Sequence, residues 1–237
     1  MTAYVFTGPT LSSQEARQVL DVVYLPPVAQ GDVYSIGQTR PEAIGIIDGY
    51  FQQVPSVWHK EILWAMAEGI HVFGAASIGA LRAAELHRFG MRGVGRIFEA
   101  YRDSKISDDD EVAVIHGPPE LNYVALCEPM INMRCTLRAA ADAGVISELT
   151  HDRLTALAKA VFYQQRTYEH LIGLAFDTTL PQSEIAALEA WLPENRVDLK
   201  RSDALRMLHE MRRLLDGGAG PMEVSYTVEN TGTWSRR

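Results

Sequence analysis

Short apolar runs alternate with segments of helical periodicity in the first half of the chain. The apolar runs predict strands at 3–7, 22–25, 43–47 and 70–73. Apolar residues three and four positions apart predict helices at 12–20, 57–68 and 78–86. Strands and helices in alternation are typical of a mostly parallel sheet with helices on its faces. The first half is therefore predicted to be an α/β core.

The pattern changes to helix after helix from residue 129 onward. Apolar positions predict helices at 130–143, 150–165, 168–176, 182–191 and 202–215. The polar, glycine-rich end of the chain predicts an extended or partly disordered arm. We therefore expect an α/β core over 1–128, a helical part over 129–216 and a tail over 217–237.

Local signals refine these elements. Ser12 is the expected N-cap of the first helix, with Glu15 completing a capping box, and Ser56 is the expected cap of the helix at 57–68. The glycines and prolines of 31–41 predict an irregular loop, and the apolar segment 112–115 predicts a further strand.

Composition narrows the possible functions. A formal net charge of −8 on 237 residues argues against a nucleic-acid-binding protein. Cys127 and Cys135 alone cannot form a disulfide framework and are expected to be thiols. No signal peptide or membrane-spanning run is recognisable, so we expect a cytoplasmic protein without a membrane partner.

The sequence Ala-Ala-Ser-Ile-Gly at 75–79 carries the main chemical signal. It lies between the fourth predicted strand and the following helix, so Ser77 is placed in a sharp strand-to-helix turn. The pattern is that of a nucleophile elbow, with Ala75 replacing the first glycine. Backbone N–H groups at the helix start favour negative charge beside this serine. A helix N-cap is the simpler alternative, and a phosphate loop is disfavoured because no Lys-Ser/Thr pair follows.

A serine nucleophile needs a base. His59 and Lys60 in the first turn of the preceding helix are candidates, and only one of them can face Ser77 because adjacent helical residues point apart. A lysine base requires desolvation, which apolar neighbours such as Trp58 and Trp64 provide. Further candidates for orienting or charge-compensating roles are Asp48, Glu61, Glu85 and His116.

Two charged segments have simpler explanations. Four adjacent carboxylates at 108–111 suggest a metal site, but adjacent residues of an extended segment point to opposite faces. At most alternate members of the run could share an ion, so a solvated turn is favoured. The basic residues of the last predicted helix are typical of a solvated face. We expect neither a metal nor a cofactor.

Several longer motifs together resemble the TfuA-like family between about Tyr4 and Ala141. They are FTGPTL, YLPPVAQGD, IGIIDGYF, SVWHKEIL, GAASIGALRAAELHRFGM, GVGRIFEAY and SDDDEVAVIHG. A less diagnostic motif, VDLKRSDA at 197–204, is similar to the C-terminal part of the family.

The resemblance implies an accessory role in peptide backbone thioamidation, within the biosynthesis of ribosomally made and modified peptides of the trifolitoxin type. The implied partners are a YcaO-type cyclodehydratase, its precursor peptide and a ThiS-type thiocarboxylated sulfur-carrier protein. The implied activity is hydrolysis of the carrier's C-terminal thiocarboxylate, which releases sulfide. The family fold is described as unlike known ones, so the sheet topology is left open.

Carried onto this chain, the hydrolase-like Ser-Lys pair of the family is Ser77 and Lys60. Backbone N–H groups of Ile78, Gly8 and Gly49 are the expected oxyanion donors. Together with Gly74 and Gly79, these glycines could line a narrow channel for the carrier tail. The rival hypothesis is a non-catalytic adaptor that docks YcaO and its peptide through the helical half and the tail.

Overall fold

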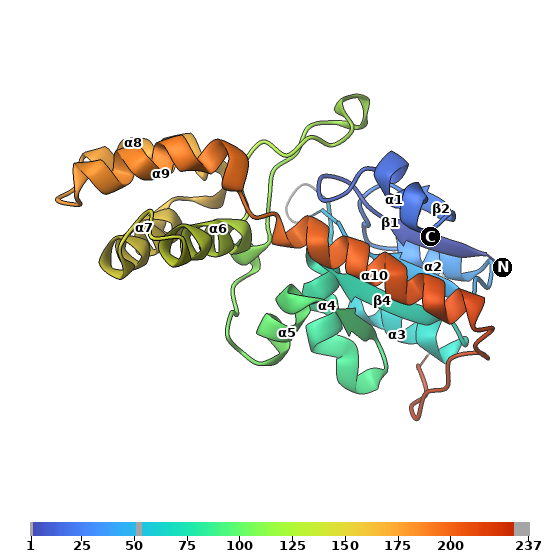
Figure 1. The fold of residues 1–237 in the computed structure, drawn as a ribbon. Helices are drawn as coiled ribbons and strands as arrows, with labels where there is room; N and C mark the ends of the chain where they lie inside the picture. The colour runs from blue at the N-terminus through green and yellow to red at the C-terminus, as the bar shows by residue number, and fades with distance from the viewer. Residues whose placement is uncertain (1, 51–53, 230–237) are drawn as a thin grey trace.

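The computed structural model describes residues 2–50 and 54–229 and contains a five-stranded sheet in which every strand is parallel (Figure 1). The strands lie in the order β2-β1-β3-β4-β5. Their bounds are β1 Ala3–Phe6, β2 Val23–Leu25, β3 Ala43–Ile46, β4 His71–Ala75 and β5 Arg92–Val94. This is the order of flavodoxin-like doubly wound sheets. The predicted α/β class with a helical C-terminal part is confirmed.

Helices cover both faces of the sheet. One face packs against α2 (Asp32–Gly37), α3 (His59–Ala67), α4 (Ile78–Leu86) and α5 (Arg96–Arg102). The other face packs against α1 (Ser13–Val19) and α10 (Leu199–Asp216). Strand side chains alternate between the two cores: Ile44 and Ile46 lie in the first, while Ala43 lies in the second.

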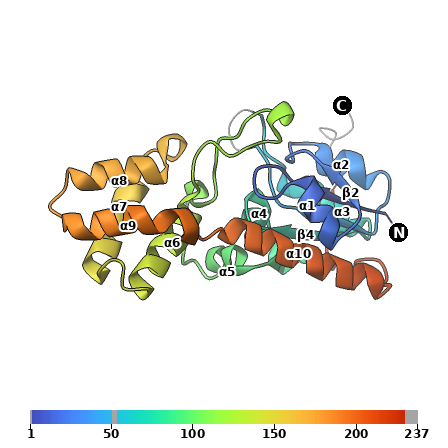
Figure 2. The ribbon, with the colours of Figure 1, turned by 45° about the horizontal axis from the view of Figure 1, so that its top comes forward.

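The helices between the sheet and α10 form a bundle with its own core at one end of the molecule (Figures 1 and 2). They are α6 (Met130–Asp142), α7 (Glu148–Ala160), α8 (Tyr168–Phe176) and α9 (Gln182–Asn195). Short 3-10 turns occur at His87–Phe89, Asp109–Glu111, Pro119–Leu121 and Tyr163–Gln165. The chain then leaves the bundle, and α10 returns along the sheet, where Met207 and Met211 pack beside Gly45.

Four of the five strands are confirmed, with end points shifted by up to two residues. The sequence pattern missed β5, because Arg-Gly-Val at 92–94 offers one apolar side chain and no periodicity. The predicted strand at 112–115 is wrong: the segment follows a 3-10 turn and leads into a hairpin in which Leu126 N donates to Ile115 O. The predicted loop at 31–41 contains α2.

Helix capping differs from expectation at α3. The N-cap of α3 is Trp58, whose N–H donates to the Glu61 carboxylate at 2.8 Å, whereas Ser56 Oγ donates to Tyr50 O. Ser12 is confirmed as the α1 cap, since its Oγ accepts from Glu15 N at 3.2 Å. The carboxylate of Glu61, the third residue of α3, thus accepts the N–H of the residue before the helix, as in one half of a capping box.

The end of the chain runs extended over residues 220–229. Side chains alternate between exposed and half-buried, as in a strand that lies on a surface. Met222 N donates to Gly69 O at 2.8 Å, and the Tyr226 hydroxyl donates to Leu63 O at 3.0 Å. The predicted tail is an ordered arm over this stretch, while 230–237 lies outside the described residues.

Two glycines bring the start of α4 into backbone contact with the sheet. A Cβ on Gly79 would lie 1.8 Å from Ile46 O, and a Cβ on Gly74 would lie 2.1 Å from Gly79 O. Real Cβ atoms do not approach backbone oxygens so closely, so both positions require glycine. This contact fixes the turn that carries Ser77.

Replacing Gly79 with alanine should therefore destabilise the protein by about 3 kcal/mol or more, because backbone must move to admit the methyl group. Gly173→Ala in α8 is the matched control, since nothing lies within 4 Å of its Cβ position. The control should stabilise the protein by about 0.5–1 kcal/mol through helix propensity. Urea unfolding of both variants measures the difference, and equal stabilities would contradict the close contact.

Candidate functional site

The turn between β4 and α4 presents Ser77 at the carboxyl edge of the sheet. Ser77 N donates to Ala75 O at 2.8 Å, two residues back, and the central residue Ala76 has a φ of 65°. A positive φ is strained for alanine, and such strain gathers at functional turns. Ser77 is the first residue before α4, so the elbow predicted from the sequence is present.

A lysine from α10 contacts this serine. Lys200 Nζ lies 3.2 Å from Ser77 Oγ and donates to Val112 O at 2.9 Å. Ser77, Lys200 and Asp48 are only 2%, 3% and 1% exposed. A serine hydroxyl and an amine at hydrogen-bond distance, shielded from water, have the geometry that a nucleophile and its base require.

Burial lowers the pKa of Lys200, because the charged ammonium loses its hydration. The Asp48 carboxylate opposes this shift from 3.9 Å away, and Asp198, Cys127 and Glu128 oppose it more weakly. The net direction is downward, toward the neutral amine that a base requires.

Asp48 follows β3 and is held by the loop that follows β1. Its Oδ2 accepts from Gly8 N at 2.9 Å and from Thr10 N at 3.0 Å, while its Oδ1 accepts from the Thr10 hydroxyl at 2.6 Å. β1 and β3 are neighbours in the sheet although β2 lies between them in sequence. Ligand sites of doubly wound sheets occur where the strand order reverses in this way.

The start of α10 is fixed by residues from two other parts of the structure. Asn132 of α6 accepts from Leu199 N at 3.0 Å and Lys200 N at 3.2 Å. Asp203 accepts from Arg96 N at 3.0 Å and Ile97 N at 2.8 Å and so caps α5. Lys200 therefore has a defined position relative to the sheet.

Sequence reasoning missed Lys200, although a signal was present. Lys200 lies at helical spacing from the buried residues Ala204, Met207 and Met211, so it occupies the apolar stripe of α10. The helix was predicted to begin at 202, which left this lysine outside the pattern. A charged residue in an apolar stripe is a signal of a functional or paired group.

The other predicted site residues lie in different surroundings. His59 Nε2 contacts Glu85 Oε2 at 2.7 Å, and Arg82 joins the same carboxylate at 2.9 Å, so these side chains form a surface cluster. His116 belongs to the hairpin after residue 115, where its Nδ1 contacts Gly117 O. Lys60 is half-buried in the first turn of α3, and its role as a base stays a prediction.

Glu61, a further candidate, has a structural partner set. Its carboxylate accepts from the N–H groups of Gly31, Tyr34 and Trp58. Burial raises its pKa, and these hydrogen bonds oppose the rise. Glu61 thus joins α2 to α3, and an orienting role for it stays a prediction.

The three backbone N–H groups expected to bind an oxyanion, those of Ile78, Gly8 and Gly49, have different surroundings. Ile78 is the first residue of α4, where a helix provides no acceptor for the N–H. The N–H of Gly8 is already donated to Asp48. A Cβ on Gly49 would lie 2.7 Å from Ile78 Cγ2, so Gly49 packs against the start of α4. Oxyanion binding by any of the three remains a prediction.

The glycine-lined channel is not supported. The Cβ positions of Gly8, Gly49, Gly74 and Gly79 are all filled by protein atoms within 3 Å. These glycines permit close packing of the loops around the site.

Three carboxylates of the acidic run at 108–111 are paired with basic side chains. Glu111 accepts two hydrogen bonds of 2.9 Å from Arg134, and Asp110 accepts one of 2.9 Å from the buried Arg166. Lys159 contacts Asp110, Asp108 and Glu111. Asp108 and Asp109 are exposed, as expected of a solvated turn. Asp110 and Glu111 differ from that expectation, because their ion pairs connect the turn to α6, to α7 and to Arg166.

One group in the described part of the chain has the spacing of metal ligands. Glu148, His151 and Asp152 in α7 have their ligand atoms within 4.8 Å of one another. Arg138 donates to Glu148 at 2.7 Å, and His151 contacts Asp152 at 2.9 Å. These contacts account for the cluster as surface ion pairs.

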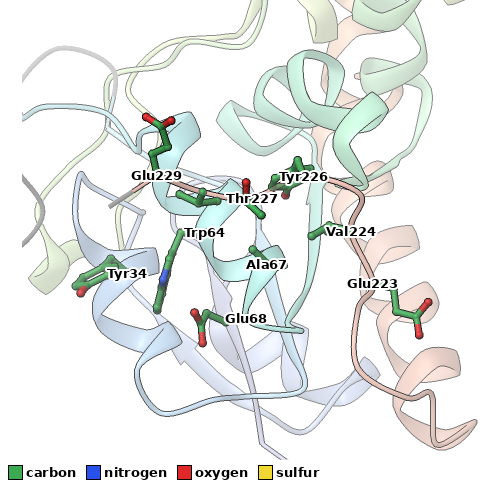
Figure 3. A pocket seen from close by; sticks show the side chains of 10 residues that line it. Tyr34, Trp64, Ala67, Glu68, Glu223, Val224, Tyr226, Thr227 and Glu229 are labelled. Carbon is green, nitrogen blue, oxygen red and sulfur yellow. The ribbon is translucent and has the colours of Figure 1, made fainter. Parts of the chain in front are cut away.

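Two pockets lie near different parts of the fold. One of about 660 Å³ lies between α3 and the C-terminal arm, with Tyr34 beside Trp64 and with Glu68 on its wall (Figure 3). None of its lining residues belongs to the Ser77 site. The other, of about 320 Å³, is lined by Thr7, Gly8 and Tyr123 among others, so it lies on the loop that holds Asp48.

Comparison with known families gives one match. A family described as TfuA-like protein matches residues 48–167, just over half of the chain. The matched segment begins at Asp48, contains Ser77 and ends before Lys200. No curated protein matches the chain. Within residues 2–50 and 54–229, no helix combines the length and the apolar character needed to cross a bilayer.

The buried lysine should make stability depend on pH. Because the folded-state pKa of Lys200 is lowered, the unfolded chain binds an extra proton between that pKa and the unfolded value of about 10.4. Relative to Lys200→Met, the wild type should therefore gain free energy of unfolding as the pH rises through this window, by at most about 1.4 kcal/mol per pH unit.

Urea unfolding at several pH values from about 6 to about 9 tests this linkage. Lys105→Met is the matched control, since the Lys105 side chain is 72% exposed. Its difference from the wild type should not change with pH in the same range. A Lys200→Met difference that is equally flat would show that the Lys200 pKa is not lowered into this pH range.

Proposed function

We propose, because the chain belongs to the TfuA-like family, that it supplies sulfide for peptide backbone thioamidation by a YcaO partner. The proposed reaction is hydrolysis of the C-terminal thiocarboxylate of a ThiS-type sulfur-carrier protein. The observation that supports it best is the contact of 3.2 Å between Ser77 and the buried Lys200.

In the first step Ser77 Oγ attacks the thiocarboxylate carbon while neutral Lys200 accepts the hydroxyl proton. The C–S bond then breaks, the proton passes from Lys200 to sulfur, and hydrogen sulfide anion leaves. The product on the enzyme is an acyl ester of Ser77. The low pKa of Lys200 suits this role, because an ordinary lysine is protonated at neutral pH.

In the second step a water molecule attacks the acyl ester, and Lys200 again accepts a proton. The C–O bond to Ser77 then breaks, and Lys200 returns this proton to Ser77 Oγ. The carrier leaves as a carboxylate, and the second proton of the water is released to solvent. Both tetrahedral intermediates carry an oxyanion beside the start of α4. The Ile78 N–H and the positive end of the α4 dipole stabilise this charge.

The carrier tail needs a path to a serine that is nearly inaccessible. The pocket of about 320 Å³ lies on the loop from Thr7 to Leu11, whose other side holds Asp48. We place the docking of the tail there, with entry to Ser77 by displacement of this loop. Loops of this kind commonly move to admit and enclose substrates.

An adaptor role is the second candidate, and the helical bundle supports it. α6–α9 have their own core and extend from the α/β body (Figure 2). Such a module offers YcaO and the precursor peptide a surface separate from Ser77. The two roles are compatible in one protein.

Sulfide release from a thiocarboxylated carrier tests the hydrolase. Ser77→Ala and Lys200→Met should each lose about 100-fold or more of the rate, because a nucleophile and its base act as a unit. Lys105→Met, with its exposed side chain, should match the wild type. Circular dichroism establishes that each variant is folded.

Lys60→Met decides between the two lysines. If Lys200 is the base, Lys60→Met should retain more than about a tenth of the wild-type rate, since a general base supplies about 100-fold or more. A Lys60→Met variant that is inactive, beside an active Lys200→Met, would restore the assignment made from the sequence. No sulfide from the wild type would refute the hydrolase.

Added sulfide separates the hydrolase from the adaptor. In a reconstituted reaction with YcaO, peptide and ATP, sulfide should restore thioamide formation with Ser77→Ala. If the protein is also an adaptor, restoration should require Ser77→Ala to be present. If the reaction proceeds equally without the protein, the adaptor role is excluded.

A further inference from the structure

A threonine that the sequence did not single out completes the buried polar chain. The Thr10 hydroxyl donates to Asp48 Oδ1 at 2.6 Å, and the same oxygen lies 3.9 Å from Lys200 Nζ. Lys200 in turn contacts Ser77 Oγ at 3.2 Å. Thr10 is itself buried, so water does not compete for the Asp48 oxygen.

The distance between Asp48 and Lys200 is the unusual feature. A buried carboxylate and a buried ammonium ordinarily approach to about 2.8 Å as a charge-assisted hydrogen bond. Here Asp48 is instead saturated by the N–H groups of Gly8 and Thr10 and by the Thr10 hydroxyl. The amine of Lys200 donates to Val112 O and Ser77 Oγ.

We propose that Thr10 is a positioning residue that holds Asp48 away from Lys200 and so keeps Lys200 available as a base for Ser77. The proposal rests on the proposed role of Lys200. The Thr10 hydroxyl neutralises part of the charge on Oδ1 and prevents this oxygen from rotating into a direct ion pair. An ion pair at closer range would favour the protonated, inactive lysine.

The other charged or titratable groups around Lys200 lie in different elements. Asp198 is the N-cap of α10, and Cys127 and Glu128 precede α6. Of these and Asp48, only Asp48 has an oxygen within 4 Å of Nζ, so it is the group through which Thr10 can act. Thr10→Val removes the Thr10 hydroxyl and leaves the N–H groups of Gly8 and Thr10 in place, so it isolates the contribution of the hydroxyl.

Thr10→Val tests the proposal, because it removes the hydroxyl and keeps the branched shape. Thr10→Ser is the matched control that keeps the hydroxyl and loses the γ-methyl group. Thr10→Ala loses both, and it replaces Thr10→Val in case valine disturbs folding. The chain has only Lys60, Lys105, Lys159 and Lys200 as lysines. Carbon-13 labelling of the lysine ε-carbons therefore gives few NMR signals, and Lys200→Met assigns the relevant one.

Titration should show a Lys200 pKa raised by about one unit in Thr10→Val and Thr10→Ala, and near the wild-type value in Thr10→Ser. The acid limb of the sulfide-release profile should move to higher pH by the same amount. The rate below that limb should fall by about tenfold, since one pKa unit changes the neutral fraction tenfold.

Unchanged titration in the variants without the hydroxyl would overturn the proposal. So would an equal shift in Thr10→Ser, because packing rather than the hydrogen bond would then be responsible. The NMR readout does not depend on turnover. If the wild type releases no sulfide, the hydrolase fails, while the titration still decides whether Thr10 controls Lys200.

Discussion

The burial of Lys200 is the constraint on which the site depends. An ammonium group without water is costly unless it is paired or loses its proton. Here the nearest carboxylate, 3.9 Å away, accepts from other donors, and within the described part of the chain the amine hydrogen-bonds to a carbonyl and a serine hydroxyl. The structure therefore buries an amine at a cost in stability, and such a cost is common at functional sites.

α10 imposes this burial, and its position depends on both parts of the protein. Its apolar stripe covers the face of the sheet that α1 alone leaves open. Asn132 of the bundle holds its first N–H groups, and its own Asp203 holds the start of α5. The position of Lys200 therefore depends on contacts with the bundle as well as with the sheet.

The sheet positions the residues that surround Lys200. The loops after β1, β3 and β4 meet at one edge, and they contribute Thr10, Asp48 and Ser77 respectively. Close backbone contact through Gly74 and Gly79 fixes the serine turn against the strands. The strands and the glycine contacts thus fix the strained turn at Ala76 and Ser77, and Lys200 of α10 packs against Ser77.

The sequence by itself determined the units that short-range patterns encode. Apolar runs located four strands, helical spacing located α4 from 78 to 86, and small residues around Ser77 predicted its turn. Longer motifs indicated the family. These features depend on neighbouring residues, so one sequence is sufficient to show them.

Only the tertiary structure decided which side chains meet. Lys200 contacts a serine 123 positions away, and Thr10 contacts an aspartate 38 positions away. The acidic run likewise finds its partners in α6, α7 and Arg166. Periodicity specifies which face of a helix is buried, but which element that face covers is set by the packing of the whole chain.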